Sequence, residues 1–196
     1  WQPAAGRAMF RAAENAIGEM HVIAEDLGIL DDSARAMFAE LGYPGMKILQ
    51  FAFDSGDDND YLPHNYKDEN CVVYTGTHDN DTLLGFIRKL GEGRQRFADA
   101  LASELERMNL PQCGGSDEEM CDSVIELCYA SVAECAIIPM QDWMKTGEEG
   151  RINMPSVLSV LNWSYRISPH YAECGLQQKI KDLTVRYGRY GINEQH

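Results

Sequence analysis

Four short apolar runs divide this chain of 196 residues, and each ends on a side chain that could bind a ligand or take part in catalysis. They lie at residues 21–25, 47–53, 71–79 and 136–141, and end on an acid, an aromatic ring, an acid and an amide. Segments with helical spacing separate them. This alternation is typical of an α/β protein with a parallel sheet. Because chemistry collects at the carboxyl ends of parallel strands, the acids Glu25 and Asp79 become candidate functional residues.

Helices are expected before, between and after these strands. The alanine-rich segment 3–17 has helical spacing and stops at Gly18, a usual helix end. Ser116 and Glu119 have the spacing of a capping box. The expected helices are 3–17, 32–41, 82–90, 95–108, 116–134 and 176–187. The long polar stretch 54–70 reads as a surface loop, and loops of this length are often functional.

Four strand–helix units in a row suit two architectures, half of an eight-stranded barrel or a small doubly wound sheet. A doubly wound nucleotide fold normally shows a glycine-rich phosphate loop after an early strand. Here that turn reads Glu25-Asp-Leu-Gly28, and no Walker motif is present. The sequence therefore favours strands five to eight of a (β/α)₈ barrel, with residues 1–196 forming a single domain.

The charge balance narrows the classes of partner. The formal net charge of −14 repels phosphate backbones, so nucleic acid is not expected, whereas a neutral sugar is not penalised. No apolar run approaches the roughly 20 residues that cross a bilayer, and no signal peptide is expected. These features indicate a cytoplasmic protein with no membrane partner.

The six cysteines form no CxxC pair, and free thiols in a reducing compartment explain them better than a metal site. Cys121, Cys128 and Cys135 are seven residues apart and are expected to share one buried helix face. His64 and His78 do not fit a zinc pattern. Neither a metal ion nor another cofactor is therefore expected.

A retaining glycosidase needs two carboxylic residues about 5 Å apart. Glu25 and Asp79 close apolar strands on alternate positions of the expected barrel, so both are expected to point into its mouth. A helix cap or a solvated loop acid is the competing interpretation, and it is stronger for Asp26, Asp81 and Asp142. His78 could bind a hydroxyl or orient Asp79, or serve as a structural histidine. Aromatic side chains could stack on sugars or belong to the core; these are Phe51, Phe53, Tyr61 and Trp163.

Longer motifs are more specific. They are Ile23-Ala-Glu-Asp-Leu-Gly28, Pro44-Gly-Met-Lys-Ile-Leu-Gln-Phe-Ala-Phe-Asp54, Leu62-Pro-His-Asn-Tyr66, Val73-Tyr-Thr-Gly-Thr-His-Asp-Asn-Asp-Thr82 and Gly150-Arg-Ile-Asn-Met-Pro155, followed by Asn162-Trp163. In this order, over nearly the whole chain, they resemble the 4-α-glucanotransferases of the amylomaltase (disproportionating enzyme) type.

The resemblance implies a (β/α)₈ enzyme that moves segments of 1,4-α-glucan between maltooligosaccharides through a covalent glucosyl-enzyme. Under it, Glu25 matches the general acid/base, Asp79 the acid that stabilises the transition state, and His78 its sugar-binding neighbour. Positions that line the donor and acceptor subsites are matched by Gly28, Phe51, Asp54 and Asn153.

The chain departs from the family at two points. The family's nucleophile is an aspartate in an Arg-x-Asp motif on an earlier strand, expected before Trp1 in an N-terminal half that would be the partner of this one. Ser156 and Leu161 stand where the family usually has glycine, so no subsite role is carried over to loop 156–161. The alternative function is a non-catalytic carbohydrate-binding or interaction fragment, and this chain alone is expected to be inactive.

Overall fold

A computed structural model describes residues 5–28, 30–169, 171 and 175–190. Three parallel strands lie side by side in chain order: β1 (Gly45–Ile48), β2 (Cys71–Tyr74) and β3 (Cys135–Ile137). Met46 lies opposite Val72, and Val72 opposite Cys135. Three α-helices connect β2 to β3, whereas β1 passes to β2 through a loop with 3₁₀ turns at Leu49–Phe51 and Pro63–Asn65. The chain is an α/β protein with a small parallel sheet, as the sequence predicts.

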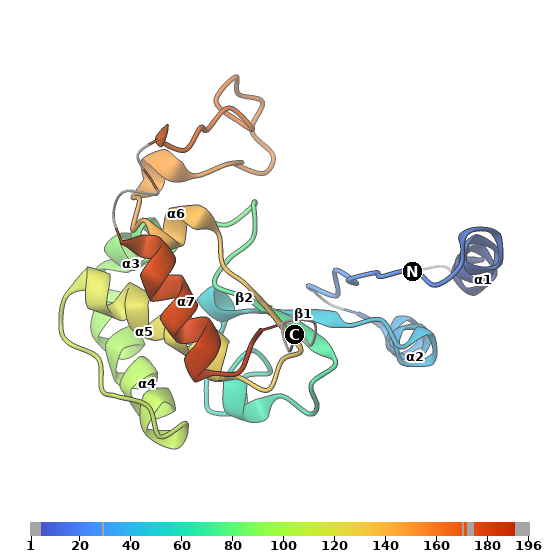
Figure 1. Ribbon diagram of the computed structural model, residues 1–196, viewed down its shortest axis with the longest axis horizontal. Coiled ribbons are helices and arrows are strands. Elements are labelled where there is room, and N and C mark those ends of the chain that lie inside the picture. The colour runs from blue at the N-terminus through green and yellow to red at the C-terminus, as the bar shows by residue number, and fades with distance from the viewer. Residues whose placement is uncertain (1–4, 29, 170, 172–174, 191–196) are drawn as a thin grey trace.

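The helices form two groups (Figure 1). They are α1 (Gly6–Ile17), α2 (Asp32–Leu41), α3 (Leu83–Lys89), α4 (Arg94–Arg107), α5 (Asp117–Ala130), the short α6 (Met140–Trp143) and α7 (Leu176–Arg186). Helices α3, α4, α5 and α7 gather beside the sheet, whereas α1 and α2 stand apart as an arm. In the described residues, no helix is long and apolar enough to cross a membrane.

Side-chain caps fix where several helices begin. The predicted capping box is confirmed, because Ser116 Oγ accepts from the Glu119 N–H while the Glu119 carboxylate accepts from the Ser116 N–H. Asp31 caps α2 by accepting from the Ala34 N–H at 2.8 Å. Such caps satisfy backbone donors that have no partner within the helix.

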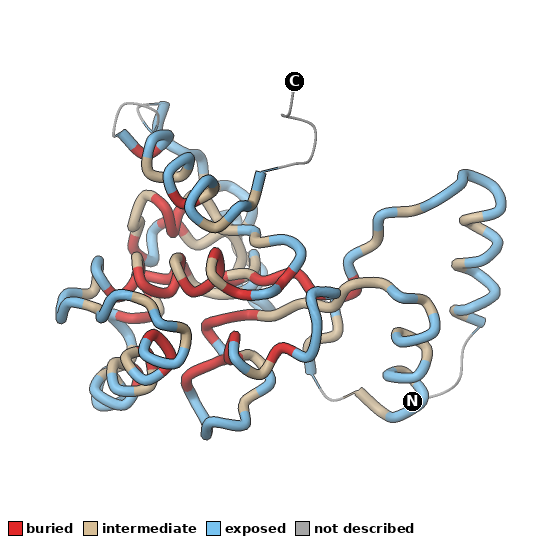
Figure 2. The backbone as a smooth tube through the Cα atoms, turned by 60° about the horizontal axis from the view of Figure 1, so that its bottom comes forward, coloured by how far each residue is buried: buried red, intermediate tan, exposed pale blue. Residues whose placement is uncertain are grey.

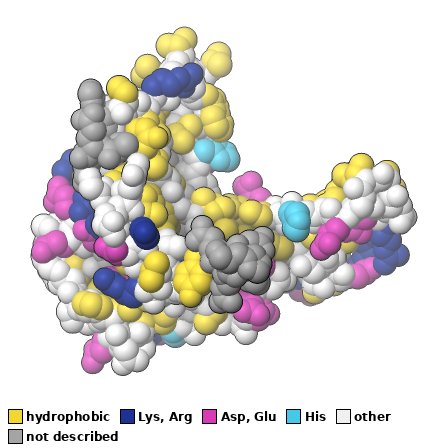
Figure 3. All heavy atoms as spheres, in the orientation of Figure 1, with side chains coloured by type: hydrophobic (Ala, Val, Ile, Leu, Met, Phe, Trp, Pro, Cys, Tyr) yellow, Lys and Arg dark blue, Asp and Glu magenta, His cyan; other side chains and the backbone are white. Residues whose placement is uncertain are grey.

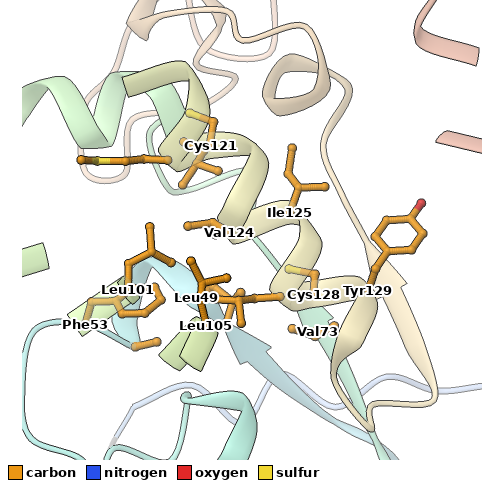
Figure 4. Close-up of a cluster of buried hydrophobic side chains, with 14 of the residues drawn as sticks. Leu49, Phe53, Val73, Leu101, Leu105, Cys121, Val124, Ile125, Cys128 and Tyr129 are labelled. Atoms are coloured by element: carbon orange, nitrogen blue, oxygen red, sulfur yellow. The ribbon is translucent and has the colours of Figure 1, made fainter. Parts of the chain in front are cut away.

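The hydrophobic core lies between one face of the sheet and helices α3 to α5. Figure 4 shows Leu49 and Val73 from the sheet side facing Leu101 and Leu105 of α4, with Val124 of α5 above them. All five side chains are fully or almost fully buried. Burial is concentrated in this body, while the α1–α2 arm has no buried helical residue (Figure 2).

The opposite face of the sheet is not covered by helices. Side chains alternate across a strand, so Met46, Ile48, Val72, Tyr74 and Ile137 share this second face. Ile48 and Val72 are buried, whereas Met46, Tyr74 and Ile137 are partly or largely exposed. In the described residues, no strand pairs with the outer edge of β1 or of β3. The described part of the sheet thus has one face packed by helices, one face that is partly exposed, and two edges without a paired strand.

The predicted strand at 21–25 is wrong. These residues are extended, but a single backbone hydrogen bond, from the Ala24 N–H to the Pro44 carbonyl at 2.8 Å, links them to the start of β1. A strand needs a repeated ladder of such bonds with a neighbour. The apolar pattern marked a segment near the sheet, but it did not reveal whether a pairing partner was there.

Four predicted elements also extend too far along the chain, and one of them is the strand predicted from Cys71, which ends at Tyr74. β1 ends at Ile48 and passes into a 3₁₀ turn at Leu49–Phe51. β3 ends at Ile137, because Pro139 has no N–H to continue a ladder and the chain turns into α6. Helix α5 stops at Ala130, so Cys135 lies exposed on β3, away from the buried Cys121 and Cys128.

Candidate functional site

A pocket of about 380 Å³ opens at the carboxyl edge of the sheet. It is lined from four directions: the Glu25 segment, the loop after β2, the α6 region after β3, and the 150–152 turn. The lining residues are Glu25, Met46, Tyr74, Gly76, Thr77, His78, Asn80, Asp81, Thr82, Ile137, Pro139, Gln141, Asp142, Gly150, Arg151 and Ile152. Strand ends therefore meet here, as in other parallel sheets.

Glu25 reaches the pocket because its two neighbours are fixed. Ala24 is buried and bonded to Pro44, while Asp26 Oδ1 accepts from the Met46 N–H at 2.8 Å. A Cβ on Gly45 would collide with the Asp26 carboxylate, so only glycine allows this close approach. The Glu25 side chain itself is exposed and free to meet a ligand.

Asp79 sits at the tip of the loop after β2, between His78 and Asn80, both of which line the pocket. Asn153 Nδ2 donates to Asp79 Oδ1 at 2.6 Å, and Arg151 Nη2 donates to the Asp79 carbonyl at 2.7 Å. His78 Nε2 lies 3.4 Å from the same Oδ1. One carboxylate oxygen of Asp79 is therefore held in place, and Oδ2 is left for another partner.

Trp163 lies beside His78 rather than in the core. The two ring centroids are 5.1 Å apart and the planes are tilted by 37°. The Trp163 backbone has a φ of 63°, which is uncommon for a bulky residue, and its N–H donates to the Ile152 carbonyl at 2.7 Å. Sequence reasoning left the role of this ring open, and the structure puts it at the edge of the pocket.

Asp142 forms part of the pocket floor, and sequence reasoning missed it. It was interpreted as a helix cap or a solvated acid, yet it is only 1% exposed. Thr75 Oγ1 donates to its Oδ2 at 2.5 Å, and the Leu83 N–H donates to its Oδ1 at 2.7 Å. Burial raises the pKa of this carboxyl above its usual range. Its position directly after an apolar strand was the one available signal.

Neither Asp79 itself nor the remaining predicted subsite residues line this pocket, and the loop after β2 reaches it through His78 and Asn80. Gly28 is exposed with a φ of 104°. Phe51 packs edge-on against Tyr61, with ring centroids 5.6 Å apart. Asp54 is exposed on loop 54–70, where Arg96 Nη2 donates to its carbonyl at 2.7 Å. Only Asn153, through Asp79, is tied to the pocket by a hydrogen bond.

A second hollow of about 630 Å³ lies beyond Arg151, which lines both spaces. Figure 3 shows hydrophobic side chains gathered on the upper lobe above the sheet. This lobe exposes Met154, Val157, Leu158, Val160, Leu161 and Trp163. Among the described residues, no group of three or more histidine, cysteine or acidic side chains is arranged to hold a metal ion.

Comparison with known proteins gives consistent results. A family model described as 4-alpha-glucanotransferase matches residues 1–172. The chain is 38% identical over 190 residues to a 4-alpha-glucanotransferase of Synechocystis, covering 96% of this chain and 35% of that protein. It is 40% identical over 170 residues to that of Thermus thermophilus, covering 86% and 33%. The chain thus spans about a third of the length of these relatives.

Solved structures agree. An amylomaltase from Streptococcus agalactiae in complex with acarbose superposes with a TM-score of 0.81 at 31% identity, covering 97% of this chain and 36% of that one. An amylomaltase from Corynebacterium glutamicum gives a TM-score of 0.67 at 16% identity, covering 92% and 31%. The second likeness shows the fold alone.

Proposed function

We propose, since this chain belongs to the 4-alpha-glucanotransferase family (glycoside hydrolase family 77), that it forms part of an enzyme transferring 1,4-α-glucan segments to acceptor sugars. The single observation that carries the proposal is the pocket in which Glu25 and His78 meet beside Asp79, within a chain that matches the family over residues 1–172. Maltooligosaccharides are the proposed substrates, and a cytoplasmic location stays a prediction.

Glu25 is assigned the proton transfers. In a retaining double displacement, an acid protonates the departing glycosidic oxygen and then, as a base, removes the proton of the incoming acceptor hydroxyl. Glu25 fits because its carboxyl is exposed to the pocket while its backbone is held by the bonds of Ala24 and Asp26. An exposed carboxyl on a fixed backbone can serve both steps.

Asp79 is assigned to the sugar ring at the point of scission. With Oδ1 held by Asn153, Oδ2 is the oxygen that would accept hydrogen bonds from ring hydroxyls. Negative charge there also favours the oxocarbenium-like transition state. His78 and Arg151 flank this position, and Trp163 offers an exposed aromatic face next to it. Asn153 thus acts at least partly through Asp79.

The half-barrel is proposed as the architecture, with residues 1–196 as part of one barrel domain. Its support is the second sheet face, on which Met46, Tyr74 and Ile137 stay partly exposed, together with the outer edges of β1 and β3, which have no partner strand in the described residues. In a closed barrel such a face becomes the packed interior, and such edges pair with further strands. Strands from another part of the protein would cover both.

The nucleophile is proposed to lie outside these 196 residues. The family resemblance implies an aspartate in an Arg-x-Asp motif, and no Arg-x-Asp triplet occurs in the sequence. The alternative of a non-catalytic binding fragment has no support from the comparisons, because each relative reported above carries an enzyme's name.

The test is Glu25→Gln in the full-length protein that carries this chain. Glutamine keeps the shape and loses the transferable proton, so disproportionation of maltotriose should fall by roughly 10²- to 10⁴-fold. Acarbose binding should change little. Glu92→Gln is the matched control, since Glu92 is exposed in the turn before α4 and away from the pocket. A Glu25→Gln variant within a few-fold of wild type would contradict the proposal.

A further inference from the structure

The two ends of the loop that carries Asp79 form hydrogen bonds to the same side chain. We define the Asp79 loop as residues 75–83, from the end of β2 to the first residue of α3. Asp142 Oδ2 accepts from Thr75 Oγ1 at one end, and Asp142 Oδ1 accepts from the Leu83 N–H at the other. The buried carboxylate of Asp142, in the pocket floor, therefore joins the two ends of the loop.

We propose that Asp142 is a positioning residue that holds the Asp79 loop in its ligand-binding shape by joining both ends of it. The inference rests on the proposed function of Asp79, and it adds a residue that touches neither the sugar nor the reacting atoms. Asp142 lies on α6, directly after β3, so it also fixes the loop relative to the neighbouring strand.

Burial makes these two hydrogen bonds hard to replace. Asp142 is 1% exposed, and among the described residues no lysine or arginine forms an ion pair with it. Asp81 carries a charge of the same sign, and this charge opposes the ionisation of Asp142. Burying a carboxyl without a cation beside it costs free energy of folding, so the presence of Asp142 here points to a positional role.

Gln50 also holds the loop at its first residue, because the Gln50 N–H donates to the Thr75 carbonyl at 3.1 Å. Asn80 Oδ1 accepts from Thr77 N–H and Oγ1 at 2.8 Å, which shapes the turn internally. Gln50 Nε2 donates to the Asp81 carbonyl at 2.9 Å, and Asn153 holds the tip. Without Asp142 the bonds to Gln50 and Asn153 would remain, but the loop would lose its link to α6 through Thr75 Oγ1 and through the first N–H of α3.

Amide hydrogen exchange on the full-length protein measures how firmly the Asp79 loop is fixed, and it does not depend on enzyme activity. In Asp142→Ala and Thr75→Val, amides of residues 76–82 should exchange about 10- to 100-fold faster, because each variant unmakes a buried hydrogen bond. Amides of α4 and α5 should keep their wild-type rates in Thr75→Val. Valine has nearly the same size as threonine, so Thr75→Val tests the proposal even if Asp142→Ala fails to fold.

Glu104→Ala is the matched control. Glu104 is also 1% exposed and also accepts from a loop, taking the His64 N–H at 3.0 Å and His64 Nδ1 at 2.6 Å. It should accelerate exchange around residues 57–65 and leave residues 76–82 unchanged. Unchanged exchange at 76–82 in Thr75→Val, or an equal increase there in Glu104→Ala, would overturn the positioning role.

Activity gives the second readout. In the full-length enzyme, Thr75→Val should lower kcat for maltotriose at least tenfold more than it raises KM, while its unfolding midpoint stays near that of wild type. Asp142→Asn should restore most of what Asp142→Ala loses, because an amide can still accept from Leu83 and donate to Thr75 Oγ1. An Asn variant as impaired as the Ala variant would contradict the account. If wild type shows no transfer, the proposed function fails, yet the exchange test still stands.

Discussion

The segment that carries Glu25 and the loop that carries Asp79 reach the same pocket, but the structure holds them very differently. The Glu25 segment (residues 20–28) is tied to the body by the Ala24–Pro44 and Asp26–Met46 hydrogen bonds near the start of β1. The Asp79 loop is bonded at both ends to Asp142, along its length to Gln50, and at its tip to Asn153.

The difference follows from where each lies relative to the sheet. The Asp79 loop follows β2, which has a strand on each side, so neighbours reach it from both directions. The Glu25 segment lies beyond β1, where the described sheet ends. Its fixed partners are therefore few, and the proposed remainder of the barrel would supply the others. These 196 residues therefore hold the Asp79 side of the pocket more firmly than the Glu25 side.

The largest expected effect concerns whether these two segments suffice. The 196-residue chain alone should show no transfer from maltotriose, because no Arg-x-Asp nucleophile is present to form the covalent intermediate. Adding the separately produced remainder of the protein should restore activity. Transfer by the chain alone, with product formation that depends on Glu25, would break the account at its base.

Packing around the two segments predicts the next effect. Leu101→Ala in α4 should lower the free energy of unfolding by about 2–5 kcal/mol, because the side chain is fully buried against the sheet. Met9→Ala on the exposed α1 should stay within about 0.5 kcal/mol in the same protein. Urea denaturation measures both. Equal losses would mean that the α1–α2 arm is packed in solution as firmly as the body.

Sequence reasoning predicted the parts whose information is local. The capping box at Ser116 and the helices from 82 to 130 follow from short-range patterns. The strand at 21–25 failed, because strand pairing depends on a neighbour that no local pattern reveals. Asp142 was missed for the same reason, since its partners Thr75 and Leu83 are 67 and 59 residues away.

A smaller effect tests the tip of the Asp79 loop. Asn153→Asp places a carboxylate within hydrogen-bonding distance of Asp79 Oδ1, so the two like charges repel and disfavour ionisation of the pair. Transfer in the full-length enzyme should fall about tenfold or more. Asn153→Ala removes the bond without adding charge and should lose less. The reverse order would indicate that Asn153 contacts the sugar and does not act through Asp79.

The smallest effect is a pH dependence from Asp142. Its pKa lies above the usual 3.8, so between 3.8 and the raised value the folded state binds its proton more tightly than the unfolded state. The free energy of unfolding contributed by this group therefore falls as pH rises through that window and levels off above it. Urea denaturation of wild type and Asp142→Asn from pH 4 to 7 should show the difference between them following this curve. A flat difference would show that burial does not disfavour the charged carboxylate.

The central claim is that Glu25 and Asp79 face one glucan site, and hydrogen exchange with acarbose tests it most directly. In the full-length protein, saturating acarbose should slow exchange in residues 20–28 and in residues 75–83 together. The decrease should be larger in the Glu25 segment, which has fewer hydrogen bonds before ligand binds. Protection confined to one of the two segments, or found in neither, would contradict the shared site.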